Sequence, residues 1–426
     1  EGFTVSGSDA HRSELTDNLE ARGAKVYIGQ KAENIQDGID VVVYTAAIHP
    51  DNPEFQEVKR RGIPMLTRAE LLGEMMRNYK NAIAIAGTHG KTTTTSMVTE
   101  IVLQAKNDPT ISVGGILPAI GGNIRVGGPE FFVTEACEYT NSFLSFFPTM
   151  EIILNIEADH LDFFKDLTDV EHSFHAFADL VPQRGFVIAN ADDSGAMAAV
   201  KGLAHPVFTF SVRDDGADCR AENVAFHDGC GEFDVMIHGK FYAHVALAVA
   251  GKHNISNALA AAAAAYVLGI GGKAVEEGLH SFHGAGRRFE FKGTYHGADV
   301  FDDYAHHPGE LHALLTTARS MPYKRIICAF QPHTYTRTQA LFEDFVRELK
   351  LADIAVLAEI YAARETNDIG ISSSQLAAEI PGAIYCSTLD QVADTLAQIA
   401  QPEDLILTVG AGDIFRAGEK LLAKEK

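Results

Sequence analysis

One glycine-rich stretch has the residue types and the spacing of a phosphate-binding loop. It consists of Gly87, Thr88, His89, Gly90, Lys91, Thr92 and Thr93. An apolar run precedes it and a helical pattern follows, so backbone N–H groups at the start of the helix would face an anion. Lys91 adds a positive charge, and a hydroxyl of Thr92 or Thr93 can bind Mg²⁺. The longer phosphate-loop pattern needs a glycine where Ile85 stands, so the match is to a shorter form, and the alternative is an ordinary turn before a helix.

Acids and a histidine follow two further apolar runs, 131–133 and 152–154. Glu135 comes after the first run and His160 after the second. Parallel α/β sheets carry their active sites at the carboxyl ends of buried strands, so both residues are candidates for a site beside the phosphate loop. The alternative is helix capping and ordinary surface polarity. An Ala-rich helix follows Asn254 and Asn257, and either residue could cap it. The functional alternative is an amide, that of Asn257, which recognises a base.

Polar clusters also end three apolar runs in the last third of the chain. They occupy 302–308, 331–338 and 410–413, and they contain Asp302, Tyr304, His306, His333 and Arg337. A glycine-flanked basic pair, Arg287 and Arg288, precedes them and suits a hinge with phosphate contact. Single histidines of this kind are often structural, but three clusters at equivalent strand ends indicate a site.

The order of elements predicts three α/β domains in a chain of 426 residues. We expect a Rossmann-like N-terminal domain over 1–80. A central domain over 81–283 would hold a parallel sheet of the P-loop ATPase type, with a small antiparallel addition at 218–250. Strands and helices alternate again over 284–426, which predicts a second Rossmann-like, doubly wound domain.

Composition narrows the classes of partner. The formal net charge of -22 argues against a nucleic-acid or anionic-membrane partner. The five scattered cysteines form no Cys-x-x-Cys pair, which is typical of a reducing cytoplasm. No apolar run approaches the length that spans a membrane, so no membrane insertion is expected.

The motifs taken together resemble those of the Mur ligases. They occupy 87–92, 135–138, 155–160, 253–257, 286–288, 302–308, 331–337 and 410–414. Within that family, the likeness is greatest to the members that add L-alanine. Relatives that add later amino acids use a modified lysine, and the matching segment 172–177 contains no lysine, which agrees with the alanine-adding members. The chain departs from them at Thr334, where many alanine-adding members have Arg.

The resemblance implies that ATP phosphorylates the carboxylate of UDP-N-acetylmuramate and that the amine of L-alanine then attacks the acyl phosphate. It implies catalytic contributions from Lys91, Glu135, His160, Arg288, His306 and Arg337. Thr92, Glu135 and His160 would hold Mg²⁺. ATP would be bound by the phosphate loop together with Asn257, Arg288 and Asp302. Tyr304, His306, His333 and Arg337 would form the L-alanine pocket.

The first domain would bind the UDP group through Ser8, Asp9, Thr45 and Ala47, again by resemblance. An acid such as Asp9 ends the second strand of a dinucleotide-type fold, so the matching glycine turn and the opening strand are expected upstream of Glu1. A monomer or weak dimer is expected. The alternatives are a ligase that attaches an intact tripeptide in cell-wall recycling, a folylpolyglutamate-type ligase, and a nucleotide-binding module without catalysis.

Overall fold

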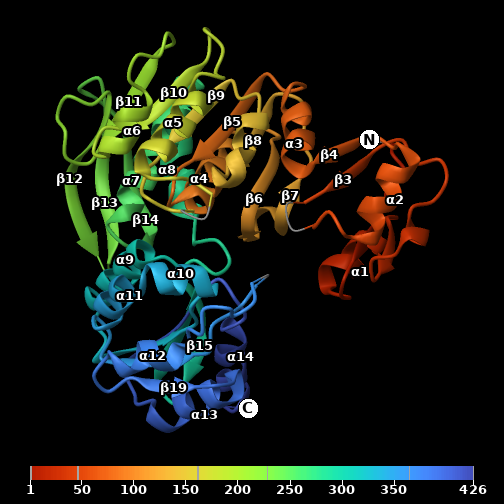
Figure 1. Ribbon diagram of the computed structural model, residues 1–426. Coiled ribbons are helices and arrows are strands. Elements are labelled where there is room, and N and C mark those ends of the chain that lie inside the picture. The colour runs from red at the N-terminus through yellow and green to blue at the C-terminus, as the bar shows by residue number, and fades with distance from the viewer. Residues whose placement is uncertain (1, 46–47, 161–162, 228, 364, 426) are drawn as a thin grey trace. The chain divides into compact units, whose positions relative to one another are not determined.

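The computed structural model describes residues 2–45, 48–160, 163–227, 229–363 and 365–425. It contains four β-sheets with helices between the strands (Figure 1). The chain divides into two compact units, and each is described by itself below. The first runs to Asn78 and includes Thr140–Phe147, and the second holds the remainder.

The first unit has two short parallel sheets. One pairs β1 (Ser6–Asp9) with β2 (Lys25–Ile28), and the other pairs β3 (Val42–Tyr44) with β4 (Met65–Thr67). Its helices are α1 (Glu14–Ala21), α2 (Pro53–Arg61) and α3 (Arg68–Met76). The side chain of Asn52 accepts N–H bonds from the first turn of α2, and Gly62 ends the helix in the left-handed conformation.

A ten-stranded sheet forms the centre of the second unit. Its order is β14-β13-β12-β11-β10-β9-β5-β8-β6-β7. The strands are β5 (Asn81–Ala86), β6 (Thr110–Leu117), β7 (Gly122–Arg125), β8 (Phe131–Glu135), β9 (Met150–Ile153), β10 (Phe186–Asn190), β11 (Val207–Ser211), β12 (Cys219–His227), β13 (Cys230–Ile237) and β14 (Lys240–Ala250). In this order, each neighbouring pair between β12 and β6 is parallel. The pairs β12 with β13, β13 with β14, and β6 with β7 are antiparallel. The predicted antiparallel addition therefore continues the parallel sheet.

Two buried helices pack on this sheet and hold the phosphate loop in place. They are α4 (Lys91–Gln104) and α7 (His253–Val267); the others here are α5 (Leu167–Ala178), α6 (Ser194–Ala199) and α8 (Gly272–Ser281). The run of alanines 258–265 in α7 is buried, and its small side chains permit close helix packing. The cap interpretation of Asn254 and Asn257 is wrong, because α7 begins after Lys252 without a side-chain cap.

The C-terminal sheet has the order β15-β16-β20-β17-β18-β19, and all of its pairs are parallel except β15 with β16. Its strands are β15 (Glu290–Tyr295), β16 (Ala298–Asp303), β17 (Arg325–Phe330), β18 (Ile354–Ala358), β19 (Ile384–Cys386) and β20 (Asp404–Val409). Its helices, largely blue in Figure 1, are α9 (Pro308–Arg319), α10 (Tyr335–Ala340), α11 (Phe342–Leu349), α12 (Ser373–Ala378), α13 (Leu389–Ile399) and α14 (Phe415–Ala423).

Apolar clusters cover both faces of this second sheet, as expected for the predicted doubly wound fold. The three-domain α/β prediction is thus confirmed, while the boundaries at 80 and 283 stay predictions. Within the described ranges, no helix has both the length and the apolar character needed to cross a bilayer.

Glu151 on β9 is a buried acid without a hydrogen-bond partner among the described residues. Burial raises its pKa well above the ordinary value. The unfolded chain therefore releases this proton first as pH rises, and native stability falls by about 1.4 kcal/mol per pH unit between the two pKa values.

We expect Glu151→Gln to lose less stability than wild type between about pH 5 and about pH 8, as measured by urea denaturation across that range. Glu130→Gln, at an exposed acid, is the control. Parallel stability curves for wild type and Glu151→Gln would contradict the prediction.

Candidate active site

The phosphate loop is shaped by two glycines that no other residue could replace without displacing its neighbours. Gly87 and Gly90 have φ angles of 149° and 84°. A Cβ on Gly90 would lie 2.6 Å from Oδ1 of Asn257, and one on Gly87 would lie 2.9 Å from Cβ of Leu154. Asn155 braces the loop, because its backbone and side-chain oxygens accept N–H bonds at 2.9 and 2.7 Å from Thr88 and His89.

Lys91 begins α4 and is held by oxygen atoms on several sides. Its ammonium donates to the carbonyls of Gly87 and Thr88 and lies 3.1 Å from Oε2 of Glu138. Burial alone would lower the pKa of Lys91, but the negative charges around it, led by Glu138, raise the pKa above its ordinary value. The lysine is therefore charged, and Glu138, which had no predicted role, is its counter-ion.

The predicted Mg²⁺ residues gather around this lysine. Oγ1 of Thr92 donates to Oε2 of Glu135 at 3.1 Å, and the other oxygen of Glu135 accepts from Gly114 N–H. Nε2 of His160 lies 3.8 Å from Oε1 of Glu138. The hydroxyl of Thr92 and the carboxylate of Glu135 are hard oxygen ligands that suit Mg²⁺, so these two members of the predicted set fit the cation, and the imidazole of His160 is its one nitrogen donor.

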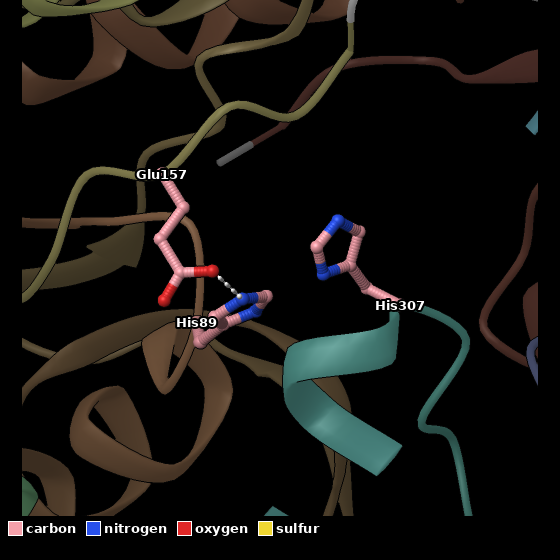
Figure 2. Close-up of side chains that lie close together, drawn as sticks. All are labelled: His89, Glu157 and His307. Carbon is pink, nitrogen blue, oxygen red and sulfur yellow. Dashed lines mark hydrogen bonds and ion pairs between the residues drawn. The ribbon is translucent and has the colours of Figure 1, made fainter. Parts of the chain in front are cut away.

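His89 lies between two carboxylates that sequence reasoning had not selected. Its Nε2 is 3.3 Å from Glu157 (Figure 2), and its Nδ1 is 3.6 Å from Glu310. Burial lowers the pKa of His89, but both acids raise it, and the net result is a pKa of about 9. The sequence did carry a signal for Glu310, which stands three residues after the N-cap His307 in a capping-box pattern.

Arg287 and Arg288 have different environments. Arg287 donates to Asp302 at 2.8 Å and to the carbonyls of Gly410 and Gly412. Asp302 is buried and also accepts from Thr408 at 2.7 Å, so its contacts here lie within the C-terminal sheet. Nη1 of Arg288 makes one ion pair, at 3.8 Å to Glu310, and the side chain lines a cavity.

That cavity, of about 520 Å³, brings together residues of the predicted ATP set. Its wall includes His89, Gly90, Thr93, Asn257 and Arg288. Aromatic side chains complete it: Phe282, Phe289, Phe291 and Phe301. A cavity of this size and mixed lining is suited to a small organic ligand.

The four predicted L-alanine residues also lie near one another. The ring of His306 is 5.5 Å from that of Tyr304 and 5.9 Å from that of His333. Arg337 lies 3.6 Å from Asp159, the residue before His160. Through Asp159, the predicted amino-acid pocket adjoins the predicted Mg²⁺ site.

The predicted UDP-group residues belong to the first unit. Ser8 donates to Glu54 at 2.6 Å, and Asp9 accepts from the backbone of His11 at 3.0 Å. Thr45 directly follows β3, and Ala47 lies outside the described residues. These four assignments stay predictions.

The adjacent arginines offer a matched test of structural importance. Arg287→Ala leaves the buried Asp302 carboxylate without its ion pair, which is expected to cost about 3–5 kcal/mol of unfolding free energy. Arg288→Ala removes a long ion pair with Glu310 and a cation–π contact with the ring of Tyr304, so its cost should stay within about 1–2 kcal/mol. Chemical denaturation of both variants measures the difference; equal losses would contradict these placements.

Comparison with known proteins matches family models along the chain. They are the "Mur ligase family, catalytic domain" at residues 1–80, the "Mur ligase middle domain" at 85–265 and the "Mur ligase, glutamate ligase domain" at 287–412. The UDP-N-acetylmuramate–L-alanine ligase of Agathobacter rectalis is 51% identical, over 100% of this chain and 93% of that protein. The protein of that name from Caldanaerobacter subterraneus is 47% identical over the same shares.

Two solved structures extend the comparison to the fold. The UDP-N-acetylmuramate–alanine ligase MurC of Thermotoga maritima has a TM-score of 0.83 at 28% identity, covering 99% of this chain and 93% of its own. A murein peptide ligase of Psychrobacter arcticus has a TM-score of 0.77 at 26% identity, with the same coverage. The phosphate loop, the acids beside it and these full-length similarities lead to one conclusion: the chain belongs to the Mur ligase family.

Proposed function

We propose that the chain joins L-alanine to the carboxylate of UDP-N-acetylmuramate, with ATP converted to ADP and phosphate. The observation that carries the proposal is the close grouping of Lys91, Glu135, Glu138 and His160 beside the cluster of Tyr304, His306, His333 and Arg337. The first set suits phosphoryl transfer and the second suits a small amino acid. The names of relatives that are about half identical over the full chain support the same pairing of substrates.

The chemistry requires that charge on the triphosphate be neutralised. A carboxylate is a poor electrophile, so an amine does not displace its oxygen unaided. The carboxylate is activated when one of its oxygens attacks the γ-phosphorus of ATP, which gives an acyl phosphate and ADP. The charged Lys91 would stabilise the phosphate oxygens, with Arg288 reaching them from the C-terminal side. Thr92, Glu135 and His160 would hold Mg²⁺, which neutralises phosphate charge and orients the substrate carboxylate.

The second step would form the amide. The amine of L-alanine attacks the acyl carbon, an amine proton is lost, and phosphate leaves. Arg337 would bind the amino-acid carboxylate, while Tyr304, His306 and His333 would surround the methyl group. Asn257 would recognise adenine from the cavity wall, and Ser8, Asp9, Thr45 and Ala47 would serve the UDP group.

The alternatives within this architecture differ in substrate. The likeness to the murein peptide ligase supports a ligase for an intact tripeptide. That structure, however, has a lower sequence identity and a lower TM-score to this chain than the alanine ligase has. A folylpolyglutamate-type ligase would need a pterin site. We also propose a monomer or weak dimer in the cytoplasm, a compartment that suits the five free cysteines.

Phosphate release with each candidate substrate tests the assignment. L-alanine with UDP-N-acetylmuramate should give the highest kcat/KM, with glycine and L-serine lower by about 1–3 kcal/mol in transition-state binding. A preference for a tripeptide, or turnover only with a folate, would replace the proposal. No ADP formation with any pair would instead favour the nucleotide-binding module.

Lys91→Ala should reduce kcat by on the order of a hundredfold or more, because a fixed charge opposite the transferring phosphoryl group is lost. Lys80→Ala, at an exposed lysine paired with Glu130, is the control and should retain wild-type turnover. Steady-state rates and circular dichroism of both variants make the measurement. Near wild-type turnover in Lys91→Ala would refute the phosphate-loop assignment.

Glu135→Gln and His160→Ala should raise the Mg²⁺ concentration needed for half-maximal rate, since a neutral amide is a weaker Mg²⁺ ligand than a carboxylate. Titrating Mg²⁺ against rate at saturating ATP measures the change. An unchanged Mg²⁺ dependence in both variants would show that these side chains are structural.

A further inference from the structure

Three side chains from separate segments form a compact group outside the predicted Mg²⁺ set. They are His89 of the phosphate loop, Glu157 after β9, and His307 at the N-cap of α9 (Figure 2). One nitrogen or oxygen atom from each lies within 4.8 Å of the others, and the two imidazole centroids are 5.4 Å apart. We call these three residues the histidine–glutamate cluster.

The ring of His307 is buried and only weakly hydrogen-bonded at this cluster. The residue is 8% exposed, and its Nε2 has no hydrogen-bond partner among the described residues. Its Nδ1 accepts only a long bond, 3.3 Å, from Gly309 N–H, which places the ring proton on Nε2 and the lone pair on Nδ1. Figure 2 shows a nitrogen of this ring turned toward His89 and Glu157.

The surroundings favour a cation. Glu157 contacts His89 on one side, and Glu310 lies 3.6 Å from its other nitrogen. Nδ1 of His89 makes no hydrogen bond to the described part of the chain, so a second imidazole in this group is incompletely satisfied. The cluster thus combines a buried imidazole, a partly exposed imidazole and a carboxylate, which are the usual ingredients of a metal centre. A bound cation would displace the proton that Glu157 and Glu310 hold on His89.

We propose that the histidine–glutamate cluster binds a divalent transition-metal ion of the Zn²⁺ class, separately from the Mg²⁺ used with ATP. Two imidazole nitrogens and one carboxylate suit Zn²⁺, Co²⁺ or Ni²⁺, whereas Mg²⁺ prefers oxygen ligands. Ligand atoms of a tetrahedral zinc site lie roughly 3.4 Å apart, so small side-chain movements would close the present spacing.

The site would have a mechanical consequence. His89 and Glu157 lie in the loops that follow β5 and β9 of the ten-stranded sheet, whereas His307 is the N-cap of α9, a helix that packs on the C-terminal sheet. A bound ion would fasten these segments together, so Zn²⁺ raises the unfolding temperature and slows any turnover that requires them to separate.

Calorimetric titration of Zn²⁺ into the full chain without nucleotide, in excess Mg²⁺, tests the site independently of the ligase activity. His307→Gln and Glu157→Gln should each weaken one binding event by about tenfold or more. His312→Gln is the matched control, because His312 lies on the same helix but pairs with Glu348 at an exposed position. It should keep wild-type binding.

A second exposed group, His227, Glu232 and His244, can take up Zn²⁺ as well, so His244→Gln defines that contribution. Circular dichroism checks that each variant is folded. If His307→Gln does not fold, Glu157→Gln tests the same site, because Glu157 is half-exposed. The visible spectrum of bound Co²⁺ should change in both cluster variants and stay unchanged in His312→Gln. The proposal fails if wild type binds no Zn²⁺, or if both cluster variants bind it as wild type does.

Discussion

The arrangement depends on keeping a buried ammonium charged where a triphosphate must bind. Lys91 is stabilised by Glu138 and by loop carbonyls, and its pKa stands above the ordinary value despite burial. Such a pair is costly to desolvate and holds only when the backbone fixes both partners. The parallel pairing of β5 with β8 and β9 supplies that rigidity, because it brings three strand ends to one edge of the sheet.

The carboxylate of Glu310 links the two sheets of the second unit by electrostatic contacts. Glu310 caps α9 by accepting from the backbones of His306 and His307, and it faces His89 and Arg288. Burial would raise the pKa of Glu310, but the nearby histidines and arginine hold it well below its ordinary value. One carboxylate thus orients a helix of the C-terminal sheet and balances positive charge at the phosphate loop.

Local pattern was enough to predict the strands, the phosphate loop and the clusters at strand ends, because each depends on period, glycine and polar residues in order. It could not separate Arg287 from Arg288, since only tertiary packing decides that Asp302 pairs with the first. Nor could it select Glu138 or Glu157, whose roles come from contacts across long sequence separations. The mistaken cap at Asn254 and Asn257 has a local cause: α7 already begins at His253, so both residues lie inside the helix, where Asn254 donates to the carbonyl of Ala250 and Asn257 donates to Asn254.

The most direct test follows one oxygen atom through the reaction. UDP-N-acetylmuramate labelled with ¹⁸O in its carboxylate is incubated with the chain, ATP, Mg²⁺ and L-alanine, and the released phosphate is analysed by mass spectrometry. An acyl phosphate forms through a carboxylate oxygen, which then leaves with the phosphoryl group when the amine attacks. The account predicts one labelled oxygen in each phosphate released; unlabelled phosphate accompanying amide formation would contradict it.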